Sequence, residues 1–157
     1  MGEEIERKFL VTGNEWKADR KGVHTCQGYL ATGNDSTVRV RIMGEKAFLT
    51  IKGKTEGLSR SEYEYEIPVS DADEMLAQLC QQPYIEKYRY RVEYAGMEWE
   101  VDEFLKENEG LIMAEVELES EEQQVELPVW AGEEVSHDPR YRNVNLMKHP
   151  YSKWGKK

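Results

Sequence analysis

Apolar and polar residues alternate along much of the chain, which is the spacing of β-strands that bury one face. The pattern is clearest near the start, where Glu4, Glu6 and Lys8 share one face of an extended segment and Ile5 and Phe9 share the other. Taken alone, such a segment is typical of a solvated sheet edge, so its meaning depends on the rest of the chain. The pattern predicts a first strand over residues 3–11.

The same alternation continues through most of the sequence. Tight turns such as Gly44-Glu45 and Ala95-Gly96 join successive segments into hairpins. The segments predicted as further strands are 24–31, 36–43, 46–52, 59–69, 85–94, 97–105 and 111–119. Capping residues and apolar spacing predict helices over 15–21, 70–82 and 138–147, with a short helix starting at Ser120. We therefore predict a mainly β (α+β) protein with about eight antiparallel strands and one domain over residues 1–157.

Most of the predicted strands carry charged residues on one face, in mid-strand positions. The acidic members are Glu4, Glu6, Glu62, Glu64, Glu100, Asp102, Glu115 and Glu117. The basic members are Lys8, Arg39, Arg41, Lys52, Lys87 and Arg89. This alternation also fits an antiparallel sheet with one wet, salt-bridged side. About eight strands can instead close into a barrel, and inward-pointing charges would then give a polar lumen with the helices packed outside.

The overall charge narrows the class of protein. Charged residues make up 33% of the 157 residues, and the net charge is −10. This balance argues against a general nucleic-acid binder, which needs a basic surface. No apolar run is long enough to span a membrane, and the acidic start lacks a signal-peptide core. We therefore predict a cytoplasmic protein that binds neither nucleic acid nor membrane.

A lumen with acidic and basic sides suits a polyphosphate carried together with divalent metal ions. Carboxylates are hard oxygen ligands that bind Mg²⁺ or Mn²⁺. Guanidinium groups donate paired hydrogen bonds to phosphate oxygens, and lysine binds phosphate as a point charge. A lipid-binding barrel is disfavoured, because its lumen should be apolar.

The charged segments also form an ordered set of motifs. Glu4-Ile5-Glu6-Arg7-Lys8 is an ExExK pattern, and the segments that follow it are Arg39-Val40-Arg41, Thr50-Ile51-Lys52, Glu62-Tyr63-Glu64, Glu86-Lys87-Tyr88-Arg89, Glu100-Val101-Asp102 and Glu115-Val116-Glu117. The set covers nearly the whole chain and resembles the CYTH superfamily, the triphosphate tunnel metalloenzymes, in its short bacterial form. The resemblance implies an eight-stranded antiparallel tunnel that binds a triphosphate group with Mg²⁺ or Mn²⁺.

The resemblance also implies roles for individual residues. Those expected to bind phosphate are Lys8, Arg39, Arg41, Lys52, Lys87 and Arg89. Those expected to hold metal are Glu4, Glu6 and Glu117 first, then Asp102 and Glu115, with Glu62 and Glu64 placing metal or water. Glu4, Glu6 and Glu117 would hold the metal that activates the attacking water. We further hypothesise that Lys8, oriented by Tyr29 on the next strand of the chain, assists the chemistry.

Several activities fit the resemblance. Hydrolysis of inorganic triphosphate is favoured, because the chain resembles the compact bacterial branch. The alternatives are hydrolysis of thiamine triphosphate, cyclisation of adenylate, removal of an RNA 5′-triphosphate, and a module that binds polyphosphate or nucleotide without turnover. An organic group would need an apolar contact, for which Trp16, Trp130 and Trp154 are the candidates.

The remaining motifs are weaker. Gly53-Lys54-Thr55 has Phe48 where a phosphate-binding loop needs its first glycine, so it is not a Walker sequence. The three histidines are scattered, and Cys26 and Cys80 lack metal or redox spacing, so both are predicted to be reduced thiols. The oligomeric state is left open, with a homodimer among the alternatives.

Overall fold

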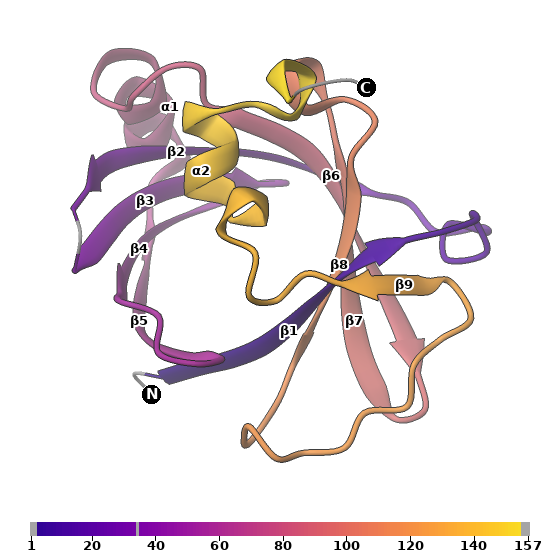
Figure 1. Ribbon diagram of the computed structural model, residues 1–157. Helices are drawn as coiled ribbons and strands as arrows, with labels where there is room; N and C mark the ends of the chain where they lie inside the picture. Colours follow the sequence, from indigo (N-terminus) through magenta and orange to yellow (C-terminus); the bar gives the residue numbers. More distant parts are fainter. Residues whose placement is uncertain (1–2, 34, 155–157) are drawn as a thin grey trace.

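The computed structural model describes residues 3–33 and 35–154, so both ends of the predicted domain and residue 34 of a predicted turn lie outside the described residues. Nine strands are formed there (Figure 1): β1 (Glu3–Val11), β2 (Val23–Thr32), β3 (Ser36–Met43), β4 (Lys46–Gly53), β5 (Ser59–Ile67), β6 (Ile85–Tyr94), β7 (Met97–Phe104), β8 (Ile112–Glu117) and β9 (Ala131–Glu134). Eight of the nine match predicted strands, with small shifts at their ends.

The strands close into a ring. Their order is β5-β4-β3-β2-β6-β7-β8-β1, and an additional pairing between β5 and β1 joins the two ends. Every pairing is antiparallel. The predicted eight-stranded antiparallel barrel is therefore confirmed, and β9 is a ninth strand added to the outside of this order.

Strand β1 has neighbours on both edges, and on one edge it has two. Its pairing with β8 runs from Glu6 to Leu10. On the other edge, residues Glu3 to Ile5 pair with β5, whereas Phe9 and Val11 pair with β9. The first strand is thus shared between the closing seam of the barrel and the late strand β9.

The apolar core surrounds the barrel, because the apolar face of each strand points outward. One cluster around Trp99, Phe9 and Trp16 packs on β1, β6, β7 and β8. Another lies between β3, β4 and helix α1 (Val69–Gln78), and includes the fully buried Val40 and Ala72. Helices packed outside a polar lumen are what the barrel interpretation of the alternation predicted.

A third cluster covers one end of the barrel. It joins barrel residues to helix α2 (Asn143–Lys148), whose Leu146 and Met147 are buried. In Figure 1, α2 lies in front of the ring of strands, with the short 3₁₀ helices η2 (Pro139–Tyr141) and η3 (Tyr151–Lys153) beside it. A further 3₁₀ turn, η1 (Lys106–Asn108), precedes β8. Within the described ranges, no helix is both long and apolar enough to cross a membrane.

Two predicted helices are wrong. Residues 15–19 form turns and residues 20–21 are irregular, and a hydrogen bond from Trp16 Nε1 to the Gly13 carbonyl holds the segment while the Trp16 ring is buried against Tyr90. Burial of this ring fixes the segment more strongly than a single helical turn could. The segment from Ser120 forms a turn in which Gln123 accepts a hydrogen bond from the Glu119 amide.

The last predicted helix is divided into two pieces. Asp138 caps the first piece as expected, since its side chain accepts from the Arg140 amide. Arg142 is extended, with ψ of 139°, and so separates η2 from α2. This break is useful to the site, because it places Arg142 and Asn143 at the barrel opening.

Candidate active site

The interior of the barrel is a cavity of about 500 Å³. Every strand from β1 to β8, together with the start of α2, contributes side chains to its wall or to the contacts behind it. The charged residues that line it are Glu4, Glu6, Lys8, Arg39, Arg41, Lys52, Arg60, Glu62, Glu64, Lys87, Arg89, Arg91, Glu98, Glu100, Glu115, Glu117 and Arg142. The inward charged faces predicted from the alternation therefore meet in one space.

Cations gather on one side of this space. Arg39 and Arg41 come from β3, and Lys87 and Arg89 come from β6, on either side of β2. All four are buried, with exposures between 1% and 9%. Buried guanidinium and ammonium groups that point into a cavity are suited to bind an anion with several oxygens.

Carboxylates gather on the opposite side, on β5, β1 and β8. Glu6 and Glu117 are direct partners in the register of β1 and β8, and the next inward pair along these strands is Lys8 with Glu115. Two carboxylates placed directly opposite each other destabilise a sheet unless a cation lies between them. This wall therefore has the donor set and the charge of a site for a hard divalent cation.

The pKa values follow from this crowding. Burial, with Glu115 and Glu4 close by, raises the pKa of Glu6 well above its usual range. Burial and neighbouring carboxylates also raise the pKa values of Glu62 and Glu117. Burial alone would raise the pKa of Glu4, but Lys52, with Nζ 3.0 Å from Glu4 Oε1, holds it below its usual value.

We expect Glu6→Gln to stabilise the protein in the absence of divalent metal. A carboxyl whose pKa is raised on folding contributes stability that is present below its unfolded pKa and is lost as pH rises through its folded pKa. Glutamine cannot ionise, so the thermal midpoint of the variant in a chelator should exceed that of the wild type at pH 8, and the difference should shrink toward pH 5. Equal midpoints at both pH values would contradict the raised pKa of Glu6.

The four buried cations Arg39, Arg41, Lys87 and Arg89 form a basic wall of the cavity. Behind this basic wall, Asp102 holds two of the cations in place. Its Oδ1 accepts from Arg89 Nε at 2.7 Å, and its Oδ2 accepts from Arg89 Nη2 and Lys87 Nζ at 2.8 Å each. Burial would raise the pKa of Asp102, but these two cations hold it far below its usual range. Burial lowers the pKa of Lys87 to about 8 despite this partner.

Helix α2 completes the basic wall from the barrel end. Asn143 Oδ1 accepts from Lys87 Nζ at 2.9 Å and from Gln27 Nε2 at 3.1 Å. Arg142 beside it lines the same cavity. Sequence reasoning missed both residues, since neither belongs to an alternating segment.

Almost all of the predicted site residues are brought together. Each predicted phosphate-binding and catalytic residue lines the cavity, as does each predicted metal ligand other than Asp102. Asp102 is 2% exposed, and its two oxygens are occupied by Lys87 and Arg89. The three tryptophans considered for an organic group are absent from this lining; Trp16 and Trp130 are buried in the outer core instead.

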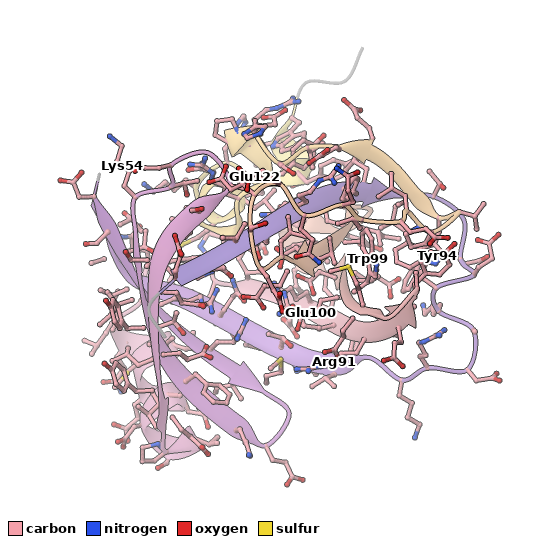
Figure 2. The ribbon with its side chains drawn as sticks, turned by 90° about the horizontal axis from the view of Figure 1, so that it is seen from below. Lys54, Arg91, Tyr94, Trp99, Glu100 and Glu122 are labelled. Atoms are coloured by element: carbon pink, nitrogen blue, oxygen red, sulfur yellow. The ribbon has the colours of Figure 1, made fainter. Side chains whose placement is uncertain are left out.

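The alternation also contained a signal for lining residues to which no phosphate-binding, metal-binding or catalytic role was assigned. Arg60, Arg91, Glu98 and Glu100 share inward faces with predicted residues and line the cavity. Figure 2 shows Arg91 near Glu100 on the neighbouring strand, and their closest atoms, Nη2 and Oε2, are 3.9 Å apart. Because Glu100 also lies 3.1 Å from Arg89 Nη1, it links Arg91 to the basic wall.

Lys8 and Tyr29 were expected to lie on adjacent strands, but their strands are not paired in the structure. Strand β2, which carries Tyr29, pairs with β3 and β6, while β1 pairs with β5, β8 and β9. Both side chains line the cavity, but Lys8 forms an ion pair with Glu115, with Nζ 3.6 Å from Oε2. The two strands were expected to be adjacent because they are consecutive, and ring closure separates them.

This closed barrel, with cations facing carboxylates across its interior, has the fold and the charge of a β-tunnel suited to a polyanion. The chain belongs to the CYTH family, because the model of the CYTH domain matches residues 2–151.

Known relatives extend over nearly the same length. The chain is 54% identical over 151 residues to an inorganic triphosphatase of Acetivibrio thermocellus, covering 96% of this chain and 97% of the relative. It is 41% identical over 147 residues to an inorganic triphosphatase of Nitrosomonas europaea, covering 91% and 95%. A crystal structure of an inorganic triphosphatase, 36% identical, superposes with a TM-score of 0.67 over 92% of this chain and 93% of that one.

Proposed function

We propose that this protein is an inorganic triphosphatase that requires Mg²⁺ or Mn²⁺. The observation that carries the proposal is the separation of charge across the tunnel, with β3 and β6 presenting cations and β1 and β8 presenting carboxylates. The names of the two relatives with 54% and 41% identity support the choice of substrate. Water attacks a terminal phosphorus, and tripolyphosphate is converted to pyrophosphate and orthophosphate.

In this proposal the basic wall binds the triphosphate together with Lys8 and Lys52, which lie beside the carboxylates. The residues that would contact phosphate oxygens are Lys8, Arg39, Arg41, Lys52, Lys87 and Arg89. Asp102 and Asn143 would position Lys87 from behind, because both accept hydrogen bonds from its ammonium group. A substrate held in line by fixed donors needs little reorganisation during transfer of the phosphoryl group.

The carboxylate wall would hold the metal. Its candidate ligands are Glu4, Glu6, Glu62, Glu64, Glu115 and Glu117, all of which line the cavity. A bound divalent ion lowers the pKa of water and neutralises charge on phosphate oxygens. Asp102 fits the role of a positioning residue for Lys87 and Arg89 better than that of a ligand, because a metal would have to displace both cations.

The role of Lys8 in the chemistry stays a hypothesis within this proposal. Its ammonium faces the carboxylate wall, where it could stabilise the leaving oxygen or pass on a proton. Tyr29→Phe deletes the hydroxyl and keeps the ring. If Tyr29 assists Lys8, kcat should fall while KM stays near its wild-type value. The measurement is steady-state kinetics of tripolyphosphate hydrolysis.

The activity is tested by the release of orthophosphate from tripolyphosphate, thiamine triphosphate, ATP and pyrophosphate, each with Mg²⁺, with Mn²⁺ and with a chelator. We expect tripolyphosphate to have the highest kcat/KM and the chelator to abolish turnover. A preference for thiamine triphosphate or ATP would mean that the tunnel serves that substrate rather than inorganic triphosphate. Tight binding of tripolyphosphate without turnover would make the protein a binding module.

We expect Arg39→Ala to weaken triphosphate binding by about ten- to a hundredfold. The side chain is 7% exposed and lines the basic wall. A hydrogen bond to a charged group contributes roughly 1.5–3 kcal/mol, which corresponds to that range of affinity. Calorimetric titration with tripolyphosphate in the presence of Ca²⁺ measures the change. Arg7→Ala is the matched control, because Arg7 lies on the outside and pairs with Glu134.

A further inference from the structure

Three side chains with different donor atoms meet on the outer wall of the barrel, away from the tunnel. His24 and Cys26 lie two residues apart on β2, and Glu86 is the direct cross-strand partner of Cys26 on β6. Because alternate residues share a face, all three point outward, whereas Lys87 and Arg89 on β6 point into the cavity. One nitrogen, sulfur or oxygen atom from each residue lies within 4.8 Å of the other two.

The spacing is close to that of a metal centre. Zn–N, Zn–S and Zn–O bonds of about 2.0–2.3 Å at tetrahedral angles put neighbouring ligand atoms roughly 3.3–3.7 Å apart. His24 Nε2 and Glu86 Oε2 are now 2.6 Å apart in a direct contact. Small rotations of exposed or half-buried side chains would open this contact by about 1 Å, without any movement of the paired strands.

The surroundings favour a cation at this point. The Glu86 carboxylate supplies a negative charge on the same outward face as His24 and Cys26. Metal binding releases the thiol proton of a cysteine ligand, so a Cys26 thiolate would add a second negative charge beside the ion. The ammonium of Lys106 lies on the other side of the carboxylate, with its Nζ 4.0 Å from Glu86 Oε1. Glu86 Oε2 is therefore available to face His24 and Cys26.

We propose that His24, Cys26 and Glu86 form a second metal site, which binds Zn²⁺ on the outer wall with water as the fourth ligand. Imidazole, thiolate and carboxylate are the ligands that Zn²⁺ uses in proteins. The tunnel offers oxygen donors, which suit Mg²⁺ and Mn²⁺, so the two sites select different ions. The bound ion fastens β2 to β6 directly behind the wall that carries Lys87.

Cobalt(II) is the probe that separates the two sites. A Co²⁺–thiolate bond gives a charge-transfer absorption band, and the described lining of the tunnel contains no cysteine. The reduced protein is titrated with Co²⁺ in excess Mg²⁺, which occupies the tunnel carboxylates. We expect one equivalent of Co²⁺ to produce the band, and Zn²⁺ to remove it by displacement.

The matched variants are Cys26→Ala and Cys80→Ala. The band should disappear in Cys26→Ala and persist in Cys80→Ala, because Cys80 is buried in the cluster under α1. His24→Ala and Glu86→Gln change more exposed residues and should weaken Co²⁺ binding by at least about tenfold. The absence of a band in the wild type, or a band that survives Cys26→Ala, would overturn the proposal. Tripolyphosphate hydrolysis is measured separately, so failure here leaves the proposed function intact.

Discussion

Asp102→Asn is expected to lower the free energy of unfolding by about 3–5 kcal/mol, because removal of one partner leaves buried charges without compensation. Asp102 is 2% exposed and is the shared partner of Lys87 and Arg89, which are 1% and 7% exposed. Asparagine keeps the shape of the side chain, so the loss in free energy of unfolding measures what the negative charge and the carboxylate oxygens of Asp102 contribute as hydrogen-bond acceptors. Chemical denaturation monitored by circular dichroism measures the change.

Glu98→Gln is the control for this prediction. Glu98 and Arg91 form an ion pair of 3.4 Å in which both side chains are 54% exposed. Exposed pairs contribute about 0–1 kcal/mol, so this variant should unfold nearly as the wild type does. A loss at Asp102 as small as that at Glu98 would mean that water screens the buried network.

The same network should make the protein sensitive to acid. Burial works against ionisation of Asp102, but Arg89 and Lys87 outweigh it and keep its pKa below the usual range. A depressed carboxyl pKa contributes stability that is present above the unfolded pKa of about 3.9 and is lost as pH falls through the folded pKa. The difference in stability between wild type and Asp102→Asn should therefore narrow in strongly acidic solution.

Glu117→Gln is expected to reduce kcat/KM for tripolyphosphate by at least about a hundredfold at limiting Mg²⁺. If Glu117 is a ligand, the variant loses one anionic oxygen opposite Glu6. A loss of about 3 kcal/mol in stabilisation by the metal corresponds to that factor in rate. Glu4→Gln should behave similarly, although it also removes the partner of Lys52.

Two features distinguish a lost ligand from a damaged fold. The rate of a ligand variant should recover in part as Mg²⁺ is raised, because weaker binding is overcome by mass action. Glu3→Gln is the matched control, since Glu3 is exposed on the same strand and faces away from Glu4. Near-normal rates for Glu4→Gln and Glu117→Gln at limiting Mg²⁺ would remove these residues from the metal site.

The alternation of residues predicted the strands and the side chains that share a face, whereas the closed barrel was implied by the resemblance of the ordered motifs. Arg39 and Arg41 line the cavity while Val40 between them is fully buried outside, as a period of two requires. The position of Asp102 was beyond the pattern. The sequence showed that Asp102 lies on the charged face of its strand. That Lys87 and Arg89 occupy its carboxylate depends on the register of β6 and β7, in which Asp102 opposes Arg89.

Segments with little periodicity were predicted least well. Strand β9 is four residues long and contains Gly132, so it has too few alternating positions to be recognised. It forms because the edge of β1 beyond β5 is free to pair. Asn143 was missed for a similar reason, since its contacts with Gln27 and Lys87 span more than fifty residues of sequence.

The shared edge of β1 has a consequence for the order of folding. Its partners include Glu117 and Glu134, which are synthesised more than a hundred residues after the strand itself. At roughly 5–20 residues per second, the edge of β1 that pairs with β8 waits on the order of 5–20 s for its partner. During this interval that edge is unpaired, the form of a strand most exposed to aggregation. The charges at Glu4, Glu6 and Lys8 should keep the nascent chain from pairing with other strands until its own partners emerge from the ribosome.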